Sequence, residues 1–141
     1  GAVLTDGSGN ILNFQQFGDE FIFNSQINNL SNGSPGTSRL TQTVSTPLGI
    51  ETRAILGIIA VVASSNSGVR FTITHPGVTD ATATTNNLNN GGENSSNNNG
   101  TWAAGTHIVR TDTSSQVAYR QDASAAVYIN TNGYYDDRGK G

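Results

Sequence analysis

The stretch that decides the fold is Ala54-Ile-Leu-Gly-Ile-Ile-Ala-Val-Val-Ala63, a run of ten residues without a polar side chain. Half of these residues are β-branched, which favours a strand over a helix. An unbroken apolar run of this length indicates a strand that is buried on both faces. Gly57 lies in the middle of the run and indicates a bulge or a close backbone contact.

An alternating segment follows this run along the chain. After the turn-forming stretch Ser64–Gly68, the residues Val69, Phe71, Ile73 and His75 alternate with polar side chains. A period of two residues indicates a strand with one buried face. We therefore expect the two strands to form one long hairpin that anchors the core.

Shorter strands are expected on both sides of this hairpin, separated by turn residues. They cover residues 21–23, 40–44, 102–110, 116–121 and 125–130. Residues 24–38 are expected to form a loop, and the tail from Thr131 is expected to begin with a turn. With the extended pieces around the turn Asp6–Asn10, about eight short strands result. The sequence therefore predicts an all-β fold, an antiparallel β-sandwich of the jelly-roll type.

The length of 141 residues corresponds to one domain, so we expect residues 1–141 to form a single β-sandwich. Residues 1–16 are mostly polar, and we expect them to form an extended N-terminal arm. Residues 84–100 consist almost entirely of Asn, Gly, Ser and Thr. A segment of this composition can bury almost nothing, which predicts an exposed loop.

Small polar residues take the place of charges in this chain. Gly, Asn, Thr and Ser occupy 65 of the 141 positions, whereas charged residues make up only 12%. The net charge is −3 and the single lysine is Lys140, so we expect no nucleic acid as a partner. No apolar run is long enough to span a membrane, and no membrane partner is expected. Cysteine is absent, which excludes disulfides, a thiol nucleophile and a Cys-based zinc site.

No pattern of catalytic or metal-binding residues stands out. His75 and His107 have no His, Asp or Glu at metal-ligand spacing. The stretch Asp6–Asn10 begins like a calcium loop, but Phe17 stands where that loop needs a glutamate. Asp136-Asp137 are adjacent, so on a strand they point to opposite faces and do not form a catalytic pair. We expect no enzymatic activity, no metal and no cofactor.

Two segments carry a resemblance to a known family. The first is Ile50–Thr74, with its apolar strand, turn and alternating strand. The second is Ser115–Gly139, which ends in Gly133-Tyr-Tyr-Asp-Asp-Arg-Gly139. This ending resembles the Gly-aromatic-x-Asp-x-Arg-Gly tail of small β-sandwich domains in virion proteins of tailed bacteriophages, namely head decoration proteins, head fibres and tail-fibre ends. Tyr134 stands where tryptophan is common in that pattern.

The resemblance implies a structural or adhesive virion module, usually a homotrimer and without enzymatic activity. We accordingly expect a capsid decoration, cement or fibre subunit located on the virion, with other virion proteins such as the major capsid protein as partners. In this picture the tail seals one end of the sandwich, and Arg138 pairs with Asp136 or Asp137. The residues expected at a subunit or virion contact are Tyr134, Tyr135, Asp136 and Arg138.

The alternative is a carbohydrate-binding, lectin-like module that recognises a host surface glycan. In that case Trp102 and Tyr119 are the residues expected to stack on sugar rings. Packing in a core or an interface is the commoner use of such aromatic side chains. A sugar platform requires exposed aromatic rings beside Asp, Asn or Arg, so the exposure of these side chains distinguishes the two hypotheses.

Overall fold

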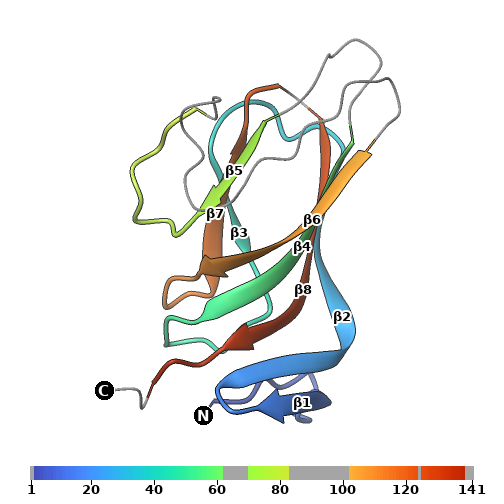
Figure 1. Ribbon diagram of the computed structural model, residues 1–141, viewed down its shortest axis with the longest axis vertical. Helices are drawn as coiled ribbons and strands as arrows, with labels where there is room; N and C mark the ends of the chain where they lie inside the picture. Colours follow the sequence, from blue (N-terminus) through green and yellow to red (C-terminus); the bar gives the residue numbers. More distant parts are fainter. Residues whose placement is uncertain (1, 62–69, 83–101, 124, 139–141) are drawn as a thin grey trace.

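The computed structural model of the chain describes residues 2–61, 70–82, 102–123 and 125–138 (Figure 1). The side chains of residues 60, 61, 102 and 103 lie outside this description, as do the predicted turn at 64–68 and the predicted loop at 84–100. Eight strands cover most of the described residues. They are β1 (Phe14–Phe17), β2 (Glu20–Asn32), β3 (Leu40–Thr43), β4 (Arg53–Val61), β5 (Phe71–Thr74), β6 (Trp102–Arg110), β7 (Gln116–Gln121) and β8 (Ala126–Tyr135).

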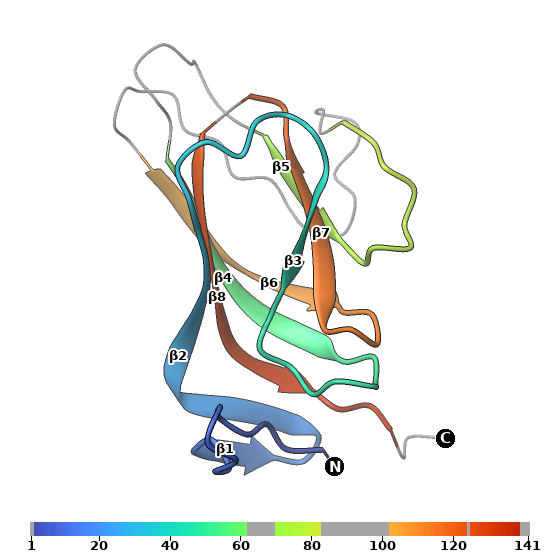
Figure 2. The same cartoon turned by 180° about the vertical axis from the view of Figure 1, so that it is seen from behind.

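The strands form two antiparallel sheets that pack face to face, as Figures 1 and 2 show from opposite sides. The five-stranded sheet has the order β1-β2-β8-β4-β6, and the three-stranded sheet has the order β3-β7-β5. The pairs β2–β8, β3–β7 and β4–β6 are nested along the chain. One long hairpin rolled up on itself gives this nesting, which is the jelly-roll arrangement. The predicted all-β sandwich is therefore confirmed.

The predicted hairpin between the apolar run and the alternating segment is wrong. Strand β4 pairs with β6 on one side and with β8 on the other. Strand β5 pairs with β7 in the opposite sheet. Local periodicity identified both strands correctly, but it carries no information about which distant strand supplies the hydrogen bonds.

Two strands are longer than the sequence predicts. Strand β2 continues through Asn24–Asn32, where a loop is expected, and β8 continues through Thr131–Tyr135, where a turn is expected. The two strands pair with each other, with a register shift between Ile22 and Ile27. Asn and Ser have low β propensity, but the long antiparallel neighbour overrides it, and the irregular register accommodates the extra residues.

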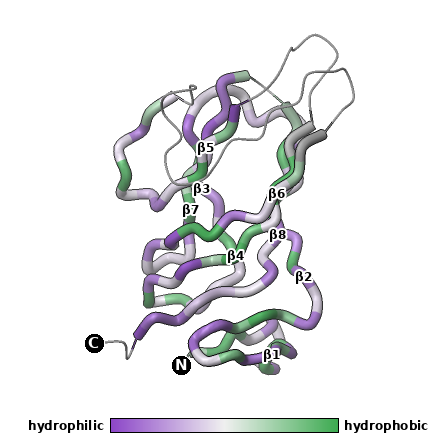
Figure 3. Tube along the Cα trace, in the orientation of Figure 1, coloured by the Kyte–Doolittle hydropathy of each residue, from purple (hydrophilic) through white to green (hydrophobic). Residues whose placement is uncertain are grey.

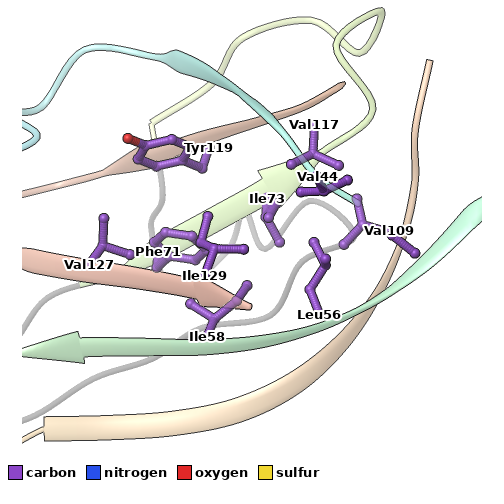
Figure 4. Packing of buried hydrophobic residues seen from close by; sticks show 11 residues of the cluster. Val44, Leu56, Ile58, Phe71, Ile73, Val109, Val117, Tyr119, Val127 and Ile129 are labelled. Carbon is purple, nitrogen blue, oxygen red and sulfur yellow. The ribbon is translucent and has the colours of Figure 1, made fainter. Parts of the chain in front are cut away.

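The main core fills the space between the two sheets (Figure 4). Alternate residues of β4, namely Ala54, Leu56 and Ile58, are fully buried there. Figure 3 shows how hydrophobic residues concentrate along this strand. The remaining members come from both sheets and the connection after β3: Val44, Phe71, Ile73, Val109, Val117, Tyr119, Val127 and Ile129. Each such aliphatic or aromatic side chain contributes about 1.5–3 kcal/mol by leaving water.

The other face of β4 is less buried than predicted. Ile55 is buried, but Ile59 and Gly57 are half-buried. The expected irregularity at Gly57 lies instead in the neighbouring strand, where Asn132 is the extra residue of a bulge in β8. A Cβ atom at Gly57 would lie 3.4 Å from Asn132 Nδ2. The close contact at this glycine is therefore with a side chain of β8 and not with a backbone.

A second, smaller core lies at the end of the sandwich near the N-terminus. It consists of Phe21, Phe23 and Tyr134, with Leu4, Phe14 and Ile27 packed against it. The N-terminal residues reach this core because they fold back at the predicted turn Asp6–Asn10, where Thr5 and Ile11 form an antiparallel bridge. The expected extended arm is thus a narrow hairpin that covers the second core.

Gly133 lies very close to the backbone of β2, and its substitution tests the pairing of β2 with β8. A Cβ atom there would lie 2.1 Å from the carbonyl oxygen of Phe21. Gly133→Ala is expected to lower the free energy of unfolding by about 3 kcal/mol or more, because the backbone of β2 cannot move away without losing this pairing. Urea denaturation measures the effect.

The matched control is Gly33→Ala, because an added Cβ at Gly33 meets nothing within 4 Å. This control should unfold at nearly the same urea concentration as the unmodified chain. Equal denaturation midpoints for the two alanine variants would contradict the register described here.

Candidate functional site

The candidate binding surface is the outer face of the five-stranded sheet, which points away from the main core. We define the outer face by three rows that run from β8 across β4 to β6. The rows are Tyr128–Ile59–Ala104, Asn130–Gly57–Thr106 and Gly133–Ile55–Ile108. None of these residues is charged, and Ile108 and Tyr128 are 49% and 36% exposed. The outer face is therefore an uncharged, weakly polar surface that extends over three adjacent strands and is partly exposed to solvent.

A shallow hollow lies in the middle row of the outer face, where Gly57 has no side chain. Its volume is 320 Å³, and its polar lining includes Gln26 of β2, Asn130 of β8 and Thr106 of β6. Tyr128 stands one row away, two residues before Asn130 on the same strand. Two amides and a hydroxyl can hydrogen-bond a neutral polar ligand, and the phenol ring can pack against an apolar ring face.

A fourth row, Tyr135–Arg53–Arg110, lies at one end of the outer face, and its arginines form ion pairs with acidic side chains. Arg53 donates from Nε and Nη2 to the two carboxylate oxygens of Asp137, both at 2.8 Å. The guanidinium of Arg53 also lies 4.6 Å from the ring centre of Tyr135. The bond to Asp137 raises the pKa of Arg53. The Tyr135 hydroxyl donates to Glu20 at 3.0 Å, and this bond raises the pKa of Tyr135.

The C-terminal segment clamps the N-terminus through Asp136, which is only 4% exposed. Arg138 donates from Nε and Nη2 to the two carboxylate oxygens of Asp136, both at 2.9 Å. The backbone N–H of Ala2 donates to Asp136 at 2.9 Å, and the Tyr134 hydroxyl donates to the carbonyl of Ala2. The bond from Arg138 is the main cause that holds the pKa of Asp136 well below its usual value. The predicted pairing of Arg138 with Asp136 is confirmed.

The four residues expected at a subunit or virion contact lie in different environments. Tyr134 is 1% exposed and stacks on Phe21 with ring centres 5.0 Å apart. Burial raises the pKa of Tyr134 to about 12. Because Tyr134 and Asp136 are buried within their own chain, their side chains have no surface left for another subunit. Tyr135 and Arg138 keep part of their surface exposed.

Of the two residues expected to stack on sugars, the structure describes the side chain of Tyr119. Tyr119 is 3% exposed and stacks on Phe71 in the main core, with ring centres 6.0 Å apart. Its expected role in sugar stacking is therefore wrong. Trp102 is the first residue of β6, and its side chain lies outside the described residues.

Tyr128 is the exposed aromatic residue of the outer face. It is one of five aromatic residues that the sequence offers for sugar stacking, but the choice of Trp102 and Tyr119 left it out. The alternation in Val127-Tyr-Ile129 could have identified it. Once Val127 and Ile129 are assigned to the core, the residue between them must point outward. Gln26 could not have been found in this way, because it lies in a segment that the sequence predicts to be a loop.

The two histidines have different surroundings. His107 of β6 is half-buried on the core side of the sheet, and burial lowers its pKa. His75 accepts a hydrogen bond at Nδ1 from the backbone of Gly77 at 2.9 Å, and its Nε2 lies 3.8 Å from Glu51. Within the described ranges, no group of three or more His, Cys, Asp or Glu side chains could hold a metal ion.

An apolar pocket of 460 Å³ lies between the N-terminal hairpin and the connection from β3 to β4. Its apolar lining includes Leu4, Leu12, Ile27 and Leu48. The hydroxyl of Thr46, which also lines it, is buried without a hydrogen-bond partner among the described residues. Among the described residues that line them, neither this pocket nor the outer face brings together a nucleophile, a base and an acid.

Comparisons with known proteins identify no relative of this chain. No protein-family model matches it, and no curated protein and no solved structure is significantly similar to it. Among the residues that the structure covers, no helix has the length and apolar character needed to cross a membrane.

Asp136→Asn tests the clamp between the two chain ends. Because the pKa of the folded carboxylate lies below its usual value of 3.8, its contribution is complete near neutral pH and declines as the pH falls below about 5. The variant should lose about 1–3 kcal/mol of unfolding free energy at pH 7. This difference from the unmodified chain should shrink between pH 5 and pH 2, as measured by urea denaturation at each pH.

The control is Asp6→Asn in the exposed turn, where an amide oxygen can still accept the backbone bonds from Ser8 and Asn10. Its stability at pH 7 should stay close to that of the unmodified chain. The prediction is wrong if the unfolding free energies of Asp136→Asn and the unmodified chain differ by the same amount at every pH in this range, because the charge of Asp136 would then play no part in stability.

Proposed function

We propose that the chain is a non-enzymatic structural subunit on the surface of a bacteriophage virion, as a capsid decoration, cement or fibre protein. It acts by association, with further copies of itself and with other virion proteins such as the major capsid protein. The resemblance of the C-terminal segment implies a trimer of such copies.

The observation that carries the proposal is the outer face. Nine positions on three neighbouring strands carry no charge, while Ile108 and Tyr128 remain open to solvent. Such a surface suits contact with another protein, because water is easily displaced from it and no charge must be desolvated. The jelly-roll fold agrees with this role by analogy, since capsid proteins and lectins both use it.

The C-terminal motif supports the proposal through the structural role of each residue. Gly133 permits the close approach of β2, Tyr134 fills the second core, and Asp136 with Arg138 holds Ala2. The motif thus closes one end of the sandwich from within a single chain. A closed, stably clamped end suits a module that must persist on the outside of a particle.

Co-sedimentation with particles tests the proposal. Purified chain should sediment with particles of the phage whose genome encodes it, and mass spectrometry of such particles should detect it. Tyr128→Asp places an uncompensated charge on the outer face and should weaken co-sedimentation at least tenfold. Leu48→Asp is the control, because Leu48 is 74% exposed and lies outside the outer face. Absence of the chain from particles, together with no co-sedimentation, would contradict the proposal.

A second function, recognition of a neutral host glycan, is favoured by the hollow at Gly57. Its lining amides Gln26 and Asn130 and the adjacent Tyr128 ring match the polar and apolar faces of a sugar. If a glycan array identifies a ligand, Asn130→Ala should reduce its affinity about tenfold, because a hydrogen bond at this site is lost. Asn24→Ala is the matched control, since Asn24 is exposed but does not line this hollow. Equal affinities of the two variants would exclude the hollow as the glycan site.

A further inference from the structure

The edges of the two sheets differ in how well they are protected. The edge strands β1, β3 and β5 each have four residues. Short edge strands offer few free backbone groups to another chain. Beyond Asn24, no described strand pairs with one side of β2, but β2 is bulged, and the carbonyl of Asn29 accepts a hydrogen bond from Gln42.

Strand β6 is the exception. It has nine residues, and all nine pair with β4 in an uninterrupted register. No described strand pairs with its other side. Its sequence, Trp102-Ala-Ala-Gly-Thr-His-Ile-Val-Arg110, contains no proline, no lysine and no acidic residue. Within the described residues, β6 therefore shows no proline, no bulge and no charge before its last residue, which are features that normally prevent an edge strand from pairing with another chain.

We infer that β6 pairs with β6 of a second copy in antiparallel orientation about a two-fold axis at Thr106. With the axis at Thr106, all nine residues of β6 pair with residues of β6 in the second copy. The two five-stranded sheets then join into one continuous sheet. Thr106 then faces Thr106 of the partner subunit, a favourable cross-strand pair. An isologous contact of this kind is the commonest form of association between identical chains.

The side chains of β6 suit this register. Ile108 of each copy lies opposite the small Ala104 position of the other, and both belong to the outer face. On the core side, His107 lies opposite Gly105, which leaves room for the imidazole. The only ionised side chain, Arg110, lies at the end of the strand, so the two guanidinium groups are at opposite ends of the contact.

This inference deepens the proposed function, because it rests on self-association and names the surface and symmetry of the contact. It makes the outer faces of two copies continuous. It also requires an even number of copies, whether as a pair or as two trimers joined through β6. A chain that binds particles but does not pair through β6 would leave its proposed place on the virion intact and overturn the β6 contact, so the two can fail separately.

Cysteine cross-linking tests the contact directly, because the natural chain has no cysteine. Residues directly opposite each other in antiparallel strands have Cα atoms about 4.5–5.5 Å apart, within the range that a disulfide spans. Thr106→Cys should therefore form a disulfide-linked dimer under mild oxidation. Thr41→Cys, at an exposed position of the four-residue edge strand β3, should remain largely monomeric on a non-reducing gel. Equal cross-linking of the two variants would overturn the inference.

Light scattering on a sizing column gives an independent measurement. The natural chain should have a mass of twice 14.7 kDa, or a larger even multiple. Thr106→Lys places two ammonium groups opposite each other and should weaken the contact at least tenfold, whereas Thr41→Lys should leave the mass unchanged. A mass of one or three chains for the natural protein would overturn the inference, as would an even mass that Thr106→Lys does not reduce.

Discussion

The fold depends on strand β4, which is paired on both sides and divides its side chains between two surfaces. Its neighbours β8 and β6 satisfy backbone groups that would otherwise be buried without partners. Its inner residues Leu56 and Ile58 pack against the three-stranded sheet and form the centre of the main core. Its outer residues Ile55 and Ile59 contribute to the uncharged outer face. The core that stabilises the domain and the surface proposed for association are therefore two sides of one strand.

The described residues near both ends of the chain make their contacts within the domain. Gly133 allows β2 to approach β8, Asp136 binds Arg138 and Ala2, and Asp137 binds Arg53 of β4. The charged residues of the C-terminal motif are thus compensated within the chain, Asp136 by Arg138 and Asp137 by Arg53. Among the described residues, the outer face and its continuation at the edge of β6 lie apart from these ion pairs and are free for a partner.

The sequence predicts the elements of this fold better than their pairing. The β-branched run around Ile58 predicts β4, and the alternation around Phe71 predicts β5, because burial imposes these local patterns. Their assignment to different sheets follows from nested long-range pairs that no local pattern encodes. The Asn-rich half of β2 is a strand only because β8 lies beside it. Tyr119, Tyr134 and Tyr128 are all tyrosines, so residue type alone does not show which of them a ligand can reach. The structure shows that Tyr119 and Tyr134 are buried and that Tyr128 is exposed.

The most direct test of the central claim is hydrogen exchange of the β6 amides at two protein concentrations. A free edge strand leaves about half of its backbone N–H groups without a partner, and these exchange quickly. If β6 is the association edge, its peptide should exchange more slowly in concentrated than in dilute protein, while the peptide of β3 stays unchanged. Exchange of β6 that is fast and independent of concentration would contradict the account.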